Sequence, residues 1–287
     1  MENRIENMDI ALLQPKFLKE LCAQHGLRPS KSYGQHFLIS DVPVKKIIAV
    51  AALEKTDTVI EIGPGFGILT LAMAPLVKQV IAFEIEKKLQ PYWAEKQKEF
   101  PNIEIVWGNA LNQFQAESYK LKAKSYKVIA NLPYQITSDV FRLFLEEVAV
   151  KPERLVVMVQ KEVAERMVAK PGDMSLLSVA VQYYGEPRIV ADVKAGSFWP
   201  PPKVDSAIVA IEVFAPKHLS TEAQNFFRVV RAGFSQKRKQ VWHNLVAALS
   251  LDPKLVKKAL RDVVGNEKVR AQNLSVGEWM QLVEILH

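Results

Sequence analysis

The chain has 287 residues, a net charge of +7 and a pI of about 9.3, with 49% hydrophobic and 24% charged residues. This composition fits a globular protein with a substantial core, and the excess positive charge favours a polyanionic partner. A single cysteine, Cys22, excludes an internal disulfide and a cysteine-rich metal site. It suits a reducing compartment, so we expect a cytoplasmic protein. No stretch approaches the roughly 20 apolar residues of a membrane-spanning helix.

The first predicted elements flank a polar loop. Residues 12–25 have the pattern of a short amphipathic helix, and a second helix is expected from Asp41, as its N-cap, to residue 53. Between them lies Gly34-Gln35-His36-Phe37-Leu38. Taken alone, this stretch is more typical of an ordinary loop. Its polar groups become candidate ligand contacts only because a motif typical of nucleotide-binding sites follows in the sequence.

That motif is a strand pattern at residues 58–62 that leads directly into Gly63-Pro64-Gly65-Phe66-Gly67 and an apolar helix. A strand, a glycine turn and a helix begin a βαβ nucleotide-binding unit, in which glycines let the backbone approach a ligand. The third glycine comes one residue earlier than in the dinucleotide fingerprint. With Glu61 before it, the spacing resembles the first motif of S-adenosylmethionine-dependent methyltransferases. The alternative is a glycine turn without a ligand.

The next two predicted strands also end in polar side chains. Residues 80–83 lead into Glu84, which lies 21 residues after Gly63, where an acid usually holds a ribose. A carboxylate can accept hydrogen bonds from both ribose hydroxyls. A surface glutamate in a charged run is the alternative. Residues 103–107 lead into Asn109, whose side-chain carbonyl can accept a hydrogen bond from an adenine amine.

A fourth apolar run, residues 126–130, is followed by Asn131-Leu132-Pro133-Tyr134. We interpret these four residues as catalytic, holding a flipped-out adenine. The Asn131 side-chain carbonyl and the Leu132 backbone carbonyl would accept the two amine hydrogens and direct the nitrogen lone pair towards a methyl donor. Pro133 biases Leu132 towards an extended conformation, and Tyr134 offers a ring face. The alternative is a strand that runs into a proline turn.

Residues 154–159 predict another strand, and helices are expected at residues 137–148 and 160–166. A proline-rich stretch predicts a rigid exposed loop before a last strand at residues 208–214; it is Phe198-Trp199-Pro200-Pro201-Pro202-Lys203-Val204-Asp205-Ser206-Ala207. Phe198 could stack on the second face of the target base. Taken alone, a loop that caps the core with Phe198 tucked in is the more common arrangement.

Residues after Pro216 have helical periodicity only. Residues 217–287 carry a net charge of +6 out of the chain's +7. A solvated basic face is the usual meaning of such a run. Phosphate binding is favoured here because the basic residues are dense and stand beside Trp242 and His243. The residues expected to bind RNA are Arg228, Arg231, Lys237, Arg238 and Lys239.

Together, these motifs, in this order, resemble those of the ribosomal RNA adenine dimethyltransferases that modify bacterial small-subunit RNA. The resemblance spans roughly residues 30–280, and the block at residues 234–239 is similar to the family's basic helix. It implies an α/β fold, with a seven-stranded Rossmann-like class I methyltransferase sheet in residues 1–215 and a small all-α RNA-binding domain in residues 216–287. Residues 1–30 would be an N-terminal extension.

The same resemblance implies N6 dimethylation of two adjacent adenosines in the 3′-terminal hairpin loop of small-subunit rRNA during ribosome assembly. The expected partner is the immature small subunit, bound by a monomer without a metal. S-adenosyl-L-methionine would be the methyl donor. The residues expected to contact S-adenosyl-L-methionine, from the resemblance or from the motifs described above, are His36, Leu38, Gly63, Gly65, Gly67, Glu84, Asn109 and Asn131.

The chain departs from the family at Asn109, where an acid is usual. An amide can still accept a hydrogen bond, so weaker cofactor binding is the most that this change predicts. Two alternatives remain open: a large-subunit rRNA adenine methyltransferase of the macrolide-resistance type, and a non-catalytic RNA-binding assembly or transcription factor of the same fold. The intact motif at residues 131–134 argues against the second.

Overall fold

The computed structural model describes residues 10–29, 34–115, 125–214 and 220–286. The chain divides into two compact units. The sheet unit comprises Met1–Ala164 and Arg188–Val213, and the helical unit comprises Glu165–Pro187 and Phe214–His287. Each unit has a hydrophobic core of its own.

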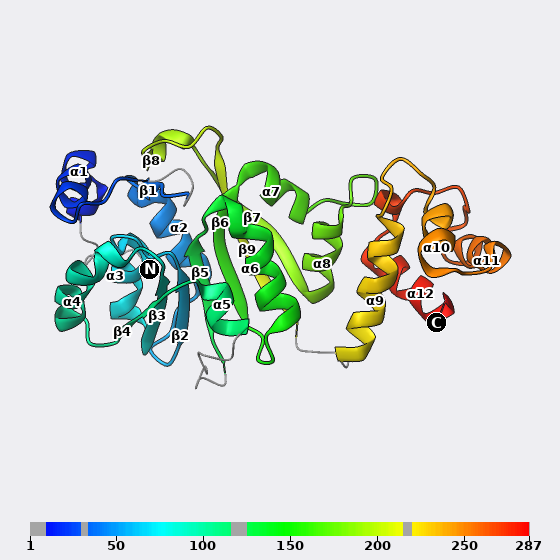
Figure 1. Ribbon diagram of the computed structural model, residues 1–287, viewed down its shortest axis with the longest axis horizontal. Coiled ribbons are helices and arrows are strands. Elements are labelled where there is room, and N and C mark those ends of the chain that lie inside the picture. Colours follow the sequence, from blue (N-terminus) through cyan, green and yellow to red (C-terminus); the bar gives the residue numbers. More distant parts are fainter. Residues whose placement is uncertain (1–9, 30–33, 116–124, 215–219, 287) are drawn as a thin grey trace. The chain divides into compact units, whose positions relative to one another are not determined.

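A seven-stranded sheet is the centre of the fold (Figure 1). Its order is β4 (Ile103–Trp107), β3 (Gln79–Glu84), β2 (Thr58–Ile62), β5 (Lys127–Asn131), β6 (Arg154–Gln160), β9 (Ser206–Val213) and β7 (Gly185–Val193). The strands from β4 to β6 are parallel, and β9 runs antiparallel to β6. The chain moves outwards from β2 to β4 and then returns to place β5 beside β2. In open α/β sheets such a reversal opens a crevice at the carboxyl ends of the strands, where ligands bind.

Alternating strand residues explain how the sheet packs. Val59, Ile129 and Val156 are fully buried in one core cluster with residues of the first four α-helices. Successive side chains of a strand point to opposite faces, so their neighbours in sequence are buried on the other face.

The helical elements that precede α8 in the chain are η2 (Ile10–Leu13), α1 (Pro15–Gln24), α2 (Asp41–Ala51), α3 (Ile68–Met73), η3 (Ala74–Leu76), η4 (Lys87–Leu89), α4 (Gln90–Glu99), α5 (Ala110–Gln115), η5 (Tyr134–Ile136), α6 (Thr137–Arg142), η6 (Leu143–Glu147) and α7 (Lys161–Met167).

A second, two-stranded sheet joins two distant motifs. β1 (Phe37–Leu38) pairs antiparallel with β8 (Phe198–Trp199), which follows the short η7 (Ala195–Ser197). The stretch expected to be an exposed proline loop therefore begins as a strand and ends within β9. This pairing places the polar loop before β1 beside the proline stretch after β8.

The helical unit contains α8 (Leu176–Tyr184), α9 (Ser220–Gly233), α10 (Val241–Leu249), α11 (Pro253–Val264), η8 (Ala271–Asn273) and α12 (Val276–Leu286). Sequence analysis placed α8 in the first domain. The structure places it with the C-terminal helices, because Tyr183 stacks on Phe226 with ring centroids 4.2 Å apart and Tyr184 stacks on Phe227 at 5.6 Å. The chain enters this unit a second time at Phe214, close to the expected boundary at residue 215.

Two local expectations differ from the structure. The sequence pattern indicated six of the seven strands and missed β7, which is polar at several positions and contains Pro187. Proline is tolerated there because β7 is the edge strand. Asp41 is the first residue of α2 and not its N-cap, which is Ser40, and the Asp41 carboxylate pairs with Lys45 Nζ at 2.5 Å.

Among the residues that the structure describes, no helix combines the length and apolar character needed to cross a bilayer.

Candidate active site

The turn between β2 and α3 has a backbone that only glycine adopts easily. Gly63, Gly65 and Gly67 have φ values of +70°, +57° and +86°, in the left-handed region. A Cβ on Gly67 would lie 2.7 Å from the Trp93 ring, and one on Gly65 would lie 3.1 Å from the ring of Phe37. The glycines therefore fix the turn and also leave room for the aromatic side chains around it.

Glu84 ends β3 opposite this turn. Its Oε2 accepts a hydrogen bond from Gly65 N (3.0 Å), and its Oε1 accepts one from Glu86 N (2.7 Å). The residue is only 4% exposed, and burial raises the pKa of its carboxyl, opposed by these backbone donors. Each carboxylate oxygen keeps a further lone pair, so the fixed carboxylate can still accept hydrogen bonds from a ligand with two hydroxyls.

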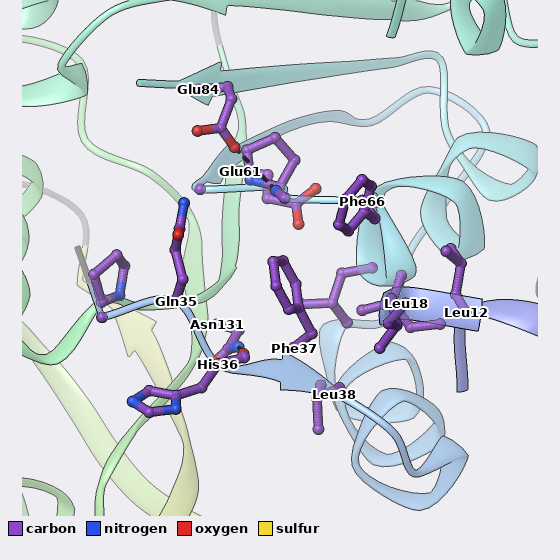
Figure 2. Close-up of a pocket in the computed structure, with 18 of the residues that line it drawn as sticks. Leu12, Leu18, Gln35, His36, Phe37, Leu38, Glu61, Phe66, Glu84 and Asn131 are labelled. Atoms are coloured by element: carbon purple, nitrogen blue, oxygen red, sulfur yellow. Dashed lines mark hydrogen bonds between the residues drawn. The ribbon is translucent and has the colours of Figure 1, made fainter. Parts of the chain in front are cut away.

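A pocket opens at the carboxyl ends of β2, β3 and β5 (Figure 2). Its empty volume, including its mouth, is about 760 Å³. Apolar side chains form much of its wall, notably Leu12, Leu18, Phe37, Phe66 and Ile85. The sequence-predicted residues that line it are His36, Leu38, Gly63, Gly65, Gly67, Glu84, Asn131 and Pro133.

Asn131 and His36 meet in this wall. Asn131 Nδ2 donates to the backbone carbonyl of His36 (3.1 Å), and His36 Nδ1 donates to the backbone carbonyl of Pro200 (2.7 Å). The first bond fixes which side of the Asn131 amide carries the oxygen. Among the described residues, Asn131 Oδ1 has no hydrogen-bond partner. A preoriented acceptor at the end of a strand is thus available to a ligand.

The three residues after Asn131 are held by the sheet. Leu132 N donates to Met158 O (3.1 Å), and no described residue donates to the Leu132 carbonyl. A hydrogen bond joins Tyr134 Oη to Ser206 Oγ (2.8 Å). The Tyr134 ring stacks on the imidazole of His36, with centroids 5.8 Å apart and an interplanar angle of 26°. The carbonyl groups of Asn131 and Leu132 and the half-buried Tyr134 ring therefore follow one another at the end of β5.

Phe198 does not have the exposure that a base-stacking role needs. Its side chain is 2% exposed and belongs to the core cluster, because its pairing with Leu38 turns it inwards. The expectation of an accessible stacking ring at this position is corrected, in favour of the alternative in which the ring is tucked into the core. Its neighbour Trp199 is only half-buried and stacks on Phe37, with centroids 6.3 Å apart.

Asn109 is also used differently from the expectation. Its Oδ1 accepts a hydrogen bond from Leu111 N (3.0 Å) at the start of α5, and the residue does not line the pocket described above. The carbonyl that was expected to meet an adenine amine is therefore engaged in capping a helix. An Asn at a helix start commonly has this role.

In the helical unit, the basic block forms a turn. Here α9 ends at Gly233, and residues 235–240, the basic turn, precede α10. The buried Asn244 side chain donates to Gly233 O (2.6 Å) and Gln236 O (3.1 Å), so it links the end of α9 and the basic turn to α10. The predicted RNA-binding side chains are all exposed, and none forms an ion pair with a described residue: Arg228, Arg231, Lys237, Arg238 and Lys239.

Several pocket residues were not predicted from the sequence. Leu12 and Leu18 come from the N-terminal helices, and nothing in their local pattern distinguishes them from ordinary core residues. Ile85 follows Glu84 directly and is an exposed apolar residue beside a ligand-type acid, which was a usable signal. Within the described ranges, no cluster of three or more His, Cys, Asp or Glu side chains could hold a metal ion.

Comparison with known proteins gives a consistent result. The model of the family described as "Ribosomal RNA adenine dimethylase" matches residues 26–287. A protein from Dehalococcoides mccartyi named "Ribosomal RNA small subunit methyltransferase A" is 45% identical, over 92% of this chain and 90% of that protein. A Clostridioides difficile protein of the same name is 36% identical, over 94% of each.

Two solved structures resemble the chain at 27% sequence identity. A dimethyladenosine transferase from Plasmodium falciparum has a TM-score of 0.72 and covers 86% of this chain and 96% of its own. The 23S rRNA methyltransferase ErmE has a TM-score of 0.71 and covers 87% of this chain and 99% of its own. The fold is therefore shared with an enzyme named for 23S rRNA as well as with one named as a dimethyladenosine transferase.

Proposed function

Because the chain belongs to the ribosomal RNA adenine dimethylase family, we propose that it dimethylates N6 of two adjacent adenosines in the 3′-terminal hairpin loop of small-subunit rRNA. As a member of this family it is an S-adenosylmethionine-dependent rRNA adenine dimethyltransferase. The observation that carries the assignment of the chemistry is the Asn131 amide in the pocket wall, which is oriented by its hydrogen bond to the His36 carbonyl and whose Oδ1 has no hydrogen-bond partner among the described residues.

Several features of the pocket support S-adenosylmethionine as the bound methyl donor. Glu84 offers carboxylate lone pairs suited to the ribose hydroxyls, and Gly63 and Gly65 let the backbone approach the ligand. The apolar wall around Phe66 and Ile85 suits an adenine ring. When bound, S-adenosylmethionine supplies an electrophilic methyl group on a sulfonium sulfur. Asn109 does not line this pocket, and its Oδ1 accepts a hydrogen bond from Leu111 N, so its proposed contact with the cofactor would use its Nδ2 donor or the second lone pair of Oδ1.

The chain's own groups act on the adenine amine. Its nitrogen is a weak nucleophile because the lone pair is shared with the ring. Asn131 Oδ1 and the Leu132 carbonyl would accept its two hydrogens and hold the nitrogen so that the lone pair faces the donor. Tyr134, held by Ser206 and His36, would stack on the base. No carboxylate base is required, since the methylated ammonium is acidic enough to lose its proton to water.

The helical unit supplies a surface for the rRNA backbone. Five exposed Lys and Arg side chains without ion pairs among the described residues are available to phosphate oxygens. A target already in a hairpin loop suits this enzyme, because flipping an adenosine out of a duplex costs a few kcal/mol and less in a loop. We further propose that the protein acts as a monomer on the immature small subunit in the cytoplasm.

The relatives' names favour the small subunit over the large one. Relatives that are 35–45% identical over nearly the whole chain are named for the small subunit. The structural likeness to ErmE, at 27% identity, is a likeness of chemistry and fold. The oriented Asn131 amide and the pocket support a catalytic role over the non-catalytic alternative.

The test compares two substrates. The protein is incubated with labelled S-adenosylmethionine and either small or large ribosomal subunits isolated without their adenine methyl groups, and the products are mapped by mass spectrometry. Dimethyladenosine at two adjacent positions of the small-subunit 3′ hairpin is expected. Label confined to the large subunit would refute the proposed substrate and leave the chemistry intact. No label in either subunit would contradict both.

A further inference from the structure

The helical unit carries an aromatic pair that the function proposed above does not use. Trp242 and His243 are the second and third residues of α10, which begins just after the basic turn (Figure 1). Their ring centroids are 3.5 Å apart, with an interplanar angle of 26°. Neighbouring positions on a helix point about 100° apart, so two such rings do not ordinarily face each other. Here the two side chains turn towards each other and form one stacked surface.

The indole of Trp242 is held at its edge and on its second face. Its Nε1 donates to Gln240 Oε1 in the basic turn (2.8 Å), and Lys257 Nζ of α11 lies 4.0 Å from the ring centroid. A cation and an imidazole this close to one ring centre cannot share a face, so the stack runs Lys257, Trp242, His243. Trp242 also packs against the core of this unit, whereas His243 is exposed. The end of the stack that faces solvent is therefore the outer face of the imidazole.

The surroundings of the stack are positively charged. Lys237, Arg238 and Lys239 of the basic turn are exposed, and Lys257 adds a positive charge behind the indole. An aromatic face beside a group of cations fits a strand of nucleic acid, in which a base and its flanking phosphates lie close together. The three acids between the start of α10 and the end of η8 are already engaged, one at the start of α11 and two in ion pairs: Asp252, Asp262 and Glu267.

We propose that the outer face of His243, backed by Trp242 and Lys257, stacks on one unpaired base of the rRNA while the basic turn contacts the phosphates beside that base. The imidazole is already held against the indole, so a base that joins the stack orders few further groups. Stacking uses the face of a base and not its edges, so the contact accepts any base that is not already stacked within a duplex. The inference rests on the proposed rRNA substrate and deepens it, because the helical unit then recognises an unpaired nucleotide as well as the phosphate backbone.

The test compares two labelled oligoribonucleotides that have the same phosphates. One is an octamer of purine riboside, which has the ring system of adenine without the amine that Asn131 and Leu132 would hold. The other is an abasic octamer with the same sugar-phosphate chain. Binding to the full-length protein is measured by fluorescence anisotropy at several salt concentrations. One stacked base is worth about fivefold or more in affinity, so the wild type should prefer the purine octamer by at least about fivefold. Equal binding of the two octamers would overturn the proposal.

Three variants separate stacking from charge. His243→Ala should bind the purine octamer about fivefold or more weakly, while its Kd for the abasic octamer stays within about twofold. His243→Phe keeps a ring and should restore most of the preference. Lys237→Ala is the matched control and should weaken both octamers alike and reduce their salt dependence. Any stacking on Tyr134 is common to all these proteins and cancels in the comparison. Unchanged purine binding by His243→Ala, or an equal loss for both octamers, would refute the role of His243.

Proton NMR gives a direct readout of the stack. The imidazole signals of His243 are those that disappear in His243→Ala, and the remaining signals of that variant report an intact fold. The purine octamer should shift the His243 signals upfield, since they would lie over a purine ring, and the abasic octamer should not. Absence of the upfield shift would contradict the proposal.

The outcome is distinguishable from that of the proposed function. Methylation of the small-subunit 3′ hairpin by a wild type that shows no purine preference would refute the stacking contact alone. A purine preference that depends on His243, without methylation of that hairpin, would refute the proposed function alone.

Discussion

Replacing Asn131 by alanine tests the catalytic assignment most simply. The variant removes Oδ1, which has no hydrogen-bond partner among the described residues, and so takes away one of the two acceptors that would hold the adenine amine. Removal of one preorganised polar group that acts on the transition state typically costs about 10²–10³ in kcat, or about 2.7–4 kcal/mol. We expect a loss of that size for the methyl-transfer step.

Binding should change far less than the rate. The Asn131 side chain makes one neutral hydrogen bond inside the protein, to the His36 carbonyl, whose net worth is about 1 kcal/mol. The Kd for S-adenosylmethionine should therefore shift by roughly fivefold at most, and RNA binding should stay near wild type.

The assay is single-turnover methylation with saturating cofactor, with calorimetry for the cofactor Kd and a gel shift for RNA. Asn112→Ala is a matched control, because Asn112 is an exposed side chain on α5 that does not line the pocket. A loss of less than tenfold in the single-turnover rate of Asn131→Ala would refute the reasoning, and so would a rate loss explained wholly by weaker cofactor binding.

Three further predictions concern packing and RNA binding. Gly67→Ala should destabilise the protein by about 2–4 kcal/mol in urea unfolding. The φ of +86° at this position disfavours any Cβ, and a Cβ there would also lie 2.7 Å from the Trp93 ring. Gly196→Ala is the control and should be nearly neutral, because open space surrounds Gly196. Phe198→Ala should cost about 3–5 kcal/mol of stability, as a core truncation does, and a fully stable variant would restore the stacking role. Replacing the three cations of the basic turn with alanine should weaken RNA binding and flatten its salt dependence, and an unaltered salt slope would remove the turn from the interface.

The sequence predicted the parts of the fold that depend on local pattern. Both β2 and β4 begin and end at the expected residues, because each is an apolar run that a glycine follows directly. The glycine turn and Glu84 meet as expected, since the carboxyl ends of parallel strands share one edge of the sheet.

Pairings between distant residues could not be predicted from a local pattern. Phe198 is buried because it pairs with Leu38, which lies far away in the chain, and neither stretch indicates the other. The amphipathic pattern of α9 continues past Gly233, but the helix ends there, and Asn244 from the next helix donates to the Gly233 carbonyl. β7 was missed because edge strands tolerate polar residues and proline.

The central claim is that two carbonyl oxygens after β5 hold the purine amine against the methyl donor. Its most direct test is a crystal structure of the protein with a non-reactive cofactor analogue and an adenosine-containing RNA loop. We predict the amine nitrogen within about 3 Å of both Asn131 Oδ1 and the Leu132 carbonyl, on the side facing the analogue's methyl-equivalent group. An adenine bound elsewhere, or a methyl-equivalent group pointing away from residue 131, would contradict the account.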